Sequence, residues 1–299
     1  MPKSYIVDDD YHEVRLDRWF KQKVINLPHS LIERIIRQNK VKLNKKRTKS
    51  SHRLQAGDLI EVFDISKFKS NNNDKKIKYI PQKKELFKYD DYVIDNNENF
   101  IVINKPAGIP VQSGTKSFKN ITDILRNSKF FKDSKPFIVH RIDKETSGIL
   151  IIAKNRKYAQ LFTTLFRIRK IHKTYLALTY GKINKSVKSI RDELTYFENK
   201  KKITQKAISN IKIIKSNDEL SYVELNPITG RKHQLRKQLL NLGNPIVGDD
   251  KYFLTNFRKI KTRNLMLHAY KIKFMINNVK YNFKAKYNNY FEQLLKEKF

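Results

Sequence analysis

The chain has 299 residues, enough for one large domain and a small one, and its 64 Lys and Arg against 29 Asp and Glu give a formal net charge of +35. This excess predicts a polyanionic partner. We favour nucleic acid as that partner. The alternatives are attraction to an anionic membrane surface, and a charge excess without a binding role that arises from a genome biased towards codons for Lys, Ile and Asn. The absence of cysteine excludes disulfides, thiolate nucleophiles, Cys-ligated zinc and iron–sulfur clusters.

The first residues, 1–5 (MPKSY), carry no hydrophobic signal segment. No apolar run approaches the roughly 18 residues that suggest a membrane span. We therefore expect a cytoplasmic protein that does not act at a membrane.

Residues 14–63 have the pattern of a small separate unit. Ser30 and Glu33 have the spacing of a capping box, which predicts the start of a helix. Short strands are expected at 41–44 and 59–63. An earlier helix is predicted from four apolar residues that share one helical face: Leu16, Trp19, Phe20 and Val24.

Five parts of this stretch match one known pattern: residues 15–17 (RLD), 30–37, Val41, Asn44 and 54–58. The pattern resembles the S4-type RNA-binding domain, whose fold is called alpha-L. The resemblance implies that the second helix and the loop after it face RNA. The basic side chains expected at that face are Arg34, Arg37, Lys45, Lys46 and Arg47. The alternative for such a cluster is a solvated surface without a ligand.

Residues 64–89 have the composition of a linker. Eight lysines and no arginine lie between Ser66 and Lys88, together with the run 71–73 (NNN), and few side chains there could fill a core. We expect a mobile, Lys-rich tether that adds non-specific attraction to phosphates.

From residue 90 to 299 the pattern changes to short apolar strands with few helices. Strands are predicted at 100–104, 149–153 and 221–225, and a helix at 233–242. The predominance of strands indicates an α+β domain built around a largely antiparallel, mixed sheet.

The most informative stretch is 140–148 (HRIDKETSG), which runs directly into the apolar strand 149–153. A polar turn at the edge of a sheet can present a reactive side chain, and this one presents Asp143 two residues after Arg141. An Asp in a turn is more often structural, because it accepts hydrogen bonds from nearby backbone N–H groups. On a chain this basic, the pair favours chemistry on a nucleic acid.

Arg236 is the expected partner of Asp143. The helix predicted at 233–242 places Arg236 beside an apolar stripe that contains Leu235 and Leu239. An arginine at the margin of a core needs an acceptor, because an unpaired buried charge is costly. Pairing would keep the Asp143 carboxylate ionised and aimed. The alternative is that Arg236 binds a phosphate or a surface acid.

Tyr175 is a further candidate, in a predicted strand with Leu176 and Leu178. A strand tyrosine usually packs, but near a catalytic acid it can stack on a flipped base.

A metal site and a two-carboxylate hydrolase are not expected. Three histidines, His140, His233 and His268, have none of the usual metal-ligand spacings. Asp143 and Glu145 lie two residues apart in a turn, which does not ensure that their carboxylates converge.

Five motifs occur in a familiar order: 104–108 (NKPAG), 140–148 (HRIDKETSG), 173–177 (KTYLA), 230–236 (GRKHQLR) and 267–269 (LHA). Together they resemble the motifs of the RluA-type pseudouridine synthases, whose second motif reads HRLDxxTSG. Ile142 stands where Leu is usual, Lys232 where Thr is common and Gln238 where His is common. None of these departures removes a group that the chemistry needs.

The resemblance implies the pseudouridine synthase fold and an isomerase that needs no cofactor, since the reaction gains and loses no atoms overall. Asp143 would be the catalytic carboxylate, which either attacks the anomeric carbon of the ribose or removes a proton from the neighbouring carbon. Arg236 would pair with it. Tyr175 would stack on the base and could take the last proton from carbon 5. Leu267 would form an apolar wall, and Arg141 would fill the space that the flipped uridine leaves.

The expected partner is large-subunit (23S) ribosomal RNA, which His140 would contact beside Arg141. The S4-type domain favours this substrate, because members of the family that act on short stem–loops often lack it. The alternatives are the same chemistry on transfer RNA and a non-enzymatic role in ribosome assembly, against which the intact set of catalytic residues argues. We expect a monomer with a swinging N-terminal module.

Overall fold

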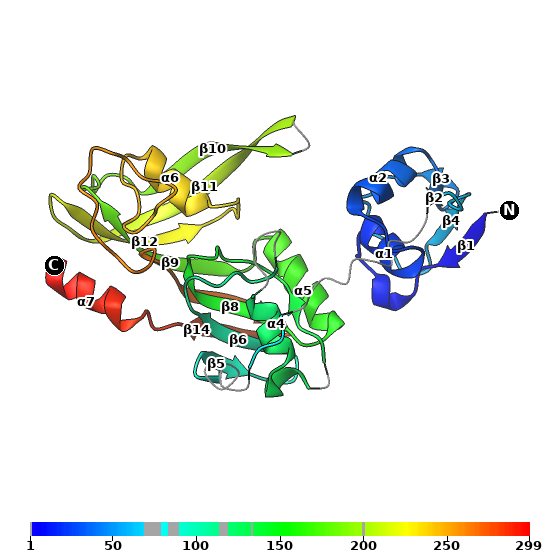
Figure 1. Ribbon diagram of the computed structural model, residues 1–299, viewed down its shortest axis with the longest axis horizontal. Helices are drawn as coiled ribbons and strands as arrows, with labels where there is room; N and C mark the ends of the chain where they lie inside the picture. The colour runs from blue at the N-terminus through cyan, green and yellow to red at the C-terminus, as the bar shows by residue number, and fades with distance from the viewer. Residues whose placement is uncertain (1, 69–78, 83–89, 114–118, 133, 199–200) are drawn as a thin grey trace. The chain divides into compact units, whose positions relative to one another are not determined.

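The computed structural model describes residues 2–68, 79–82, 90–113, 119–132, 134–198 and 201–299. The chain divides into two compact units, Met1–Ile77 and Lys78–Phe299 (Figure 1). Most of the predicted linker, 64–89, lies outside the described residues. None of the described helices is long and apolar enough to cross a membrane.

The N-terminal unit packs two α-helices on a small antiparallel sheet whose strand order is β1-β4-β2-β3. Its first strand precedes the predicted start of this unit at residue 14, because β1 pairs with β4 along their whole length. The elements in chain order are β1 (Lys3–Ile6), η1 (Asp9–Tyr11), α1 (Leu16–Lys23), α2 (His29–Arg37), β2 (Val41–Leu43), β3 (Lys46–Arg47) and β4 (Leu59–Val62).

Helix α2 does not begin with the predicted capping box. It starts at His29 after Pro28, and Ser30 lies inside its first turn without a cap hydrogen bond. Glu33 instead accepts a hydrogen bond from Ser50 Oγ at 3.4 Å. Pro28 has a fixed φ and an extended ψ of 143° and takes the N-cap position, so the helix starts two residues before the box requires.

The second unit is built on a large mixed sheet with the order β10-β11-β12-β9-β13-β8-β6-β5. All of its described pairs are antiparallel except β8 with β13. The α+β prediction is therefore confirmed. Its strands are β5 (Val93–Asn96), β6 (Phe100–Lys105), β7 (Phe137–Ile138), β8 (Ser147–Ala153), β9 (His172–Tyr180), β10 (Ser189–Glu198), β11 (Lys201–Ser216), β12 (Leu220–Pro227), β13 (Leu267–Ile276) and β14 (Val279–Lys284). Its helices are α4 (Ile121–Arg126), η2 (Lys129–Phe131), α5 (Arg156–Arg167), α6 (Gln234–Asn241) and α7 (Asn289–Lys298).

Strands β6 and β8 are buried on both faces. In β6, Ile101 and Ile103 pack with α4, whereas Phe100 and Val102 pack with α5 through Phe162. Burial on both faces explains why these strands read as uninterrupted apolar runs and not as alternating patterns. The core of this half of the sheet therefore lies directly behind the turn that connects β7 to β8.

Gly148 makes the parallel contact between β8 and β13 possible. It has a φ of +108°, and a Cβ there would lie 2.3 Å from the carbonyl oxygen of Ala269. Only glycine fits this approach. The contact brings the end of the 140–148 turn beside the start of β13.

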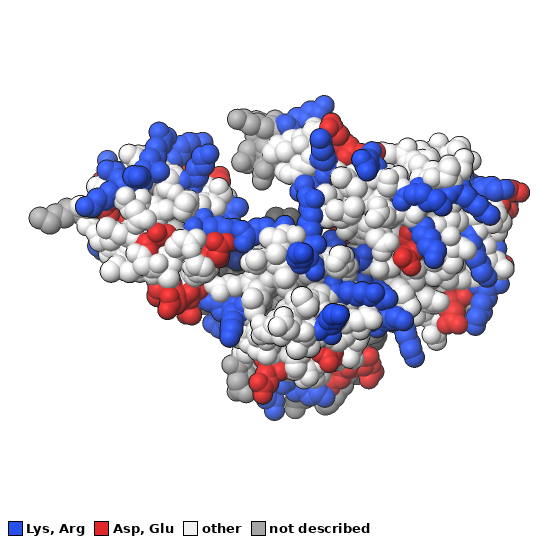
Figure 2. Space-filling model, turned by 180° about the vertical axis from the view of Figure 1, so that it is seen from behind, with Lys and Arg blue, Asp and Glu red and all other residues white. Residues whose placement is uncertain are grey.

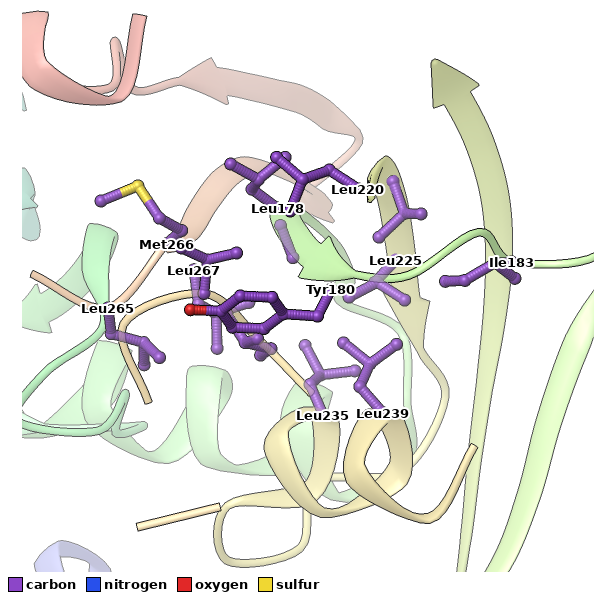
Figure 3. Close-up of a cluster of buried hydrophobic side chains, with 14 of the residues drawn as sticks. Leu178, Tyr180, Ile183, Leu220, Leu225, Leu235, Leu239, Leu265, Met266 and Leu267 are labelled. Carbon is purple, nitrogen blue, oxygen red and sulfur yellow. The ribbon is translucent and has the colours of Figure 1, made fainter. Parts of the chain in front are cut away.

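Helix α6 covers the other half of the sheet. Figure 3 shows Leu235 and Leu239 pointing from α6 towards side chains of the strands, among them Tyr180 and Leu267. This packing fixes the rotation of α6 about its axis. It therefore determines the direction of Arg236, which follows Leu235 in the helix.

Candidate active site

The turn that carries Asp143 is tied down on two sides. Thr146 donates its backbone N–H to the Asp143 carbonyl oxygen at 3.2 Å. The Lys144 carbonyl oxygen accepts from the Gly108 N–H at 2.9 Å and from Lys105 Nζ at 3.1 Å. Lys105 is fully buried. Burial lowers its pKa to about 7, although the negative charges of Glu145 and Asp143 act to raise it. The 104–108 motif therefore holds the turn in place.

Asp143 has a different neighbour at each carboxylate oxygen. Arg236 Nη1 lies 3.7 Å from Oδ2, and His233 Nε2 lies 3.8 Å from Oδ1. These distances exceed hydrogen-bond range, so the contacts are electrostatic. The Asp143 side chain keeps 27% of its surface exposed, so the carboxylate stays accessible to a ligand.

The main partner of Arg236 is Asp249, and the ion pair with Asp143 is the longer of the two. Nε donates to Asp249 Oδ2 at 2.6 Å and Nη2 donates to Oδ1 at 2.7 Å, and both side chains are buried. Burial opposes the charge on Arg236, but the hydrogen bond and charge of Asp249, with the charge of Asp143, raise its pKa above the usual value. Asp249 thus satisfies the buried guanidinium, while Nη1 faces Asp143.

Asp249 and Tyr252 support both neighbours of Asp143. Neither was predicted as a site residue, although Asp249 ends the stretch 244–249 (NPIVGD), which resembles the family's usual continuation of the 230–236 motif. Asp249 Oδ1 also accepts the backbone N–H groups of Lys251 and Tyr252, at 3.0 and 2.9 Å. The Tyr252 ring centroid lies 5.0 Å from the Arg236 guanidinium carbon, and its hydroxyl lies 2.9 Å from His233 Nδ1. The available signal was that a buried arginine requires a buried acid.

His233 is held in a left-handed backbone conformation, with φ 54°, immediately before α6. This conformation is uncommon outside glycine and costs about 1 kcal/mol or more. Burial lowers the pKa of His233, and the nearby cations Arg236, Lys251 and Lys232 add to this effect, while Asp143 opposes it. The ring is therefore neutral at neutral pH and faces Asp143 as a polar, uncharged group.

Asp143 opens onto a cavity of about 530 Å³, a volume in the range of small-molecule sites. The structure brings all the predicted site residues of this unit to its wall: Arg141, His140, Asp143, Tyr175, Arg236 and Leu267. Arg141 is exposed at the surface, whereas Leu267 is only 3% exposed.

His140 is engaged within the protein. Its Nε2 accepts the backbone N–H of Ile151 at 2.8 Å, and its ring stacks on Phe166 with centroids 4.6 Å apart. Burial and the charge of Lys173 lower its pKa to about 3. His140 is therefore a neutral, fixed part of the wall and not a cationic contact for phosphate.

Tyr175 lies half-buried on β9, between Leu225 of β12 and Ala269 of β13. Burial raises its pKa, and the negative charge of Asp143 raises it further. The phenol therefore keeps its proton in the free protein.

Comparison with known proteins is consistent with this geometry. Residues 99–241 match the family model described as RNA pseudouridylate synthase, and residues 14–60 match the S4 domain. A relative from Rickettsia felis named ribosomal large subunit pseudouridine synthase C is 36% identical over 252 residues, which cover 80% of this chain and 81% of that protein.

This chain belongs to the RNA pseudouridylate synthase family. As a member it is an RNA-modifying isomerase with an added S4 domain. A relative of the same name from Buchnera aphidicola subsp. Baizongia pistaciae is 33% identical over 286 residues, covering 90% of this chain and 88% of that protein. Human RNA pseudouridylate synthase domain containing 4 has a similar structure, with a TM-score of 0.61 and 25% identity over 71% of this chain and 94% of that one.

The S4 domain of this synthase carries a separate basic groove of about 1330 Å³. Arg37, Lys46 and Arg47 line it, and the other two predicted contacts, Arg34 and Lys45, are exposed on the same helix and hairpin. On the face drawn in Figure 2, Lys and Arg are spread widely, while Asp and Glu gather in a few small groups. This distribution suits a polyanionic ligand.

Among the described residues, no group of three or more His, Cys, Asp or Glu side chains is arranged to hold a metal ion.

Proposed function

We propose that this protein isomerises specific uridines of large-subunit ribosomal RNA to pseudouridine, with Asp143 acting on a uridine that has left its stack. The observation that carries the proposal is the partly exposed Asp143 carboxylate at the wall of a nucleoside-sized cavity, flanked by Arg236 and His233. The substrate is supported by the names of the relatives and by the basic S4 domain.

The reaction breaks the bond between ribose C1′ and uracil N1 and forms a bond between C1′ and C5. Asp143 either attacks C1′ as a nucleophile or removes the proton from C2′, and both routes release uracil with the electron pair of the broken bond. In both routes the carboxylate loses its negative charge while the freed base rotates. When C5 bonds to C1′, the ester bond to Asp143 breaks in the first route, and in the second route Asp143 returns its proton to C2′. C5 then gives up its proton and N1 gains one, so atoms balance.

Tyr175 is a candidate for the last proton transfer because it lines the same cavity as Asp143. Burial raises the pKa of the phenol, so it enters the reaction with its proton. The phenol can pass that proton to the freed uracil anion and then accept the C5 proton, while the ring stacks on the base.

The uridine reaches Asp143 only after it leaves the RNA stack, which costs a few kcal/mol. Exposed Arg141 lies beside the cavity and would occupy the space that the base leaves. Backbone contacts to the basic surface would offset the cost. Buried Leu267, on the strand next to that of Tyr175, would form an apolar wall. We expect the protein to act in the cytoplasm, where ribosomal RNA lies, as a monomer and without a cofactor.

The test is to map pseudouridines in ribosomal and transfer RNA from a strain that lacks the gene, complemented with wild-type or Asp143→Asn protein. Loss of specific pseudouridines from large-subunit RNA, restored by the wild type alone, is expected. The purified Asp143→Asn protein should bind RNA within about twofold of the wild type, since the substitution keeps shape and removes one negative charge.

Asp218→Asn is the matched control, because Asp218 is 93% exposed and pairs with Lys182 on the surface. It should restore every site. Loss of pseudouridine from transfer RNA alone would move the activity to that substrate, and an unchanged map would favour a role in ribosome assembly without catalysis.

A further inference from the structure

A second cavity, of about 640 Å³, adjoins Asp143. It shares Asp143, His233 and Arg236 with the first cavity, so both open on the same side chains. Most of its wall comes from the segment 248–265, which lies beyond the residues 99–241 that match the family model. This wall therefore belongs to the part of the chain that the family model does not define.

The segment 248–265 is anchored to the rest of the unit. Gly248 has a φ of +81°, and a Cβ there would lie 2.4 Å from the Asn264 carbonyl oxygen, so the segment folds tightly back on the glycine. The Ile260 N–H donates to the Tyr180 hydroxyl at 2.8 Å. Its side chains therefore form a built wall and not a loose loop.

The second cavity has an excess of positive charge. Six cations and three acids line it, and the excess stays positive when buried Asp249, behind Arg236, is included. The acids have basic neighbours in the wall: Asp143 with Arg236, Glu145 with Lys144 and Asp250 with Lys259. Lys251, Lys261 and Arg263 form no ion pair within the described part of the chain. Unpaired like charges repel one another, and an anionic ligand would remove that repulsion.

We propose that the second cavity binds the nucleotide next to the target uridine, with Lys261 and Arg263 holding its phosphates. This inference rests on the proposed function. The two cavities have similar volumes and meet at Asp143, so a strand with its target ribose at Asp143 places one nucleotide in each. Because phosphates carry no sequence information, this site positions the strand and does not read its bases.

The first experiment compares two variants of equal charge. Lys261→Gln with Arg263→Gln removes two cations from the cavity, and Lys280→Gln with Lys284→Gln removes two exposed cations from β14. Each phosphate contact to single-stranded RNA contributes about 0.7 to the slope of log affinity against log salt. The cavity pair should lower that slope by about 1.4 and raise KM about tenfold with kcat nearly unchanged. An equal change in the β14 pair would overturn the proposal.

The second experiment uses an 11-nucleotide single-stranded RNA with the mapped uridine at its centre and one neutral methylphosphonate linkage at each position in turn. Neutralising one or two linkages beside the uridine should weaken binding to the wild type. The same neutral linkages should not weaken binding to the Lys261→Gln/Arg263→Gln protein any further, because it already lacks the cations that contact them. Equal losses in both proteins would contradict the assigned contact. If the wild type modifies no RNA, the proposed function fails by itself. The cavity is then tested by the binding of an oligouridylate to the Asp143→Asn protein, with and without Lys261→Gln and Arg263→Gln, by the same comparison of salt slopes.

Discussion

At the scale of single residues, Asp143 depends on neighbours that are fixed by side chains behind them. Arg236 gives two of its nitrogens to Asp249 and only the third faces Asp143. His233 is held by Tyr252, which also lies against Arg236. The position of the Asp143 carboxylate therefore depends on side chains that lie behind its two neighbours.

Asp249→Asn tests this dependence. The substitution leaves the Arg236 guanidinium buried without its counter-charge, which typically costs about 3–5 kcal/mol of unfolding free energy. We expect a loss of that order in chemical denaturation, and a fall in kcat that exceeds the change in RNA affinity.

Asp250→Asn is the neighbouring control. Its side chain is 85% exposed and pairs with Lys259 on the surface, so its loss should change stability by less than about 1 kcal/mol. Equal destabilisation by the two substitutions would contradict the role given to Asp249.

Tyr175→Phe and Tyr175→Leu separate the two roles of Tyr175. Phe keeps the ring and removes the proton acceptor, so RNA binding should stay within about twofold while the rate falls about 100-fold or more. Leu removes the ring as well, and should cost a further 1–3 kcal/mol or so of binding. Single-turnover assays with saturating enzyme measure the rate apart from binding. A nearly normal rate for the Phe variant would contradict the role of Tyr175 in proton transfer and support stacking on the base as its role.

At the scale of elements, the pairing of β8 with β13 connects the turn that carries Asp143 to His268. His268 Nδ1 lies 2.8 Å from Ser147 Oγ, and Nε2 lies 3.1 Å from the Ala285 carbonyl oxygen. Burial lowers the pKa of His268 to about 4, although the hydrogen bond to Ala285 opposes this. The ring thus joins β8, β13 and the end of β14 in its neutral form.

This depressed pKa predicts a loss of stability in mild acid. Between pH 6.5 and about 4, the unfolded chain binds a proton at His268 that the folded chain does not, so stability falls as pH falls. The slope should approach about 1.4 kcal/mol per pH unit for this histidine, and His268→Gln should remove that share. Hydrogen exchange of the slowest amides of β9 and β13, from pH 6.5 to 5, measures it. His172→Gln, at an exposed position of β9, should leave the slope as it is.

The elements themselves were largely predictable from the sequence. The apolar runs 100–104 and 149–153 predicted their strands correctly. Both strands are buried on both faces, so apolar side chains are needed at consecutive positions and not at alternate ones. The start of α2 was wrong because Pro28 outweighs the capping pattern after it. The pairing of Asp249 with Arg236 was not predicted, because only the fold shows which acid lies behind Arg236.

At the scale of the whole molecule, the chain joins an S4 domain to a synthase domain, and both carry basic surfaces. The groove of the S4 domain is lined by residues from α2, from the β2–β3 hairpin and from the segment before β4. Because this groove and the cavity beside Asp143 lie in different units, we expect that RNA binding and the reaction can be changed separately.

Replacing Lys45, Lys46 and Arg47 together by Gln tests that separation. Loss of three phosphate contacts should lower the salt slope of RNA binding by about 2, with the single-turnover rate on bound RNA unchanged. Gln at Lys3, Arg18 and Lys21, which are exposed and do not line the groove, is the control of equal charge. A similar salt slope for both triple variants would contradict a specific role of the groove, because it would show that only the total positive charge attracts the RNA.

The anchoring of the Asp143 turn has a consequence for how substrates are selected. The turn runs directly into β8, which is buried on both faces, and it is tied to Lys105 and Gly108, so reshaping it would require opening the core. Accommodation must then come from the RNA. A uridine in a loop or bulge, whose neighbours unstack at low cost, will be modified in preference to the same base inside a stiff duplex.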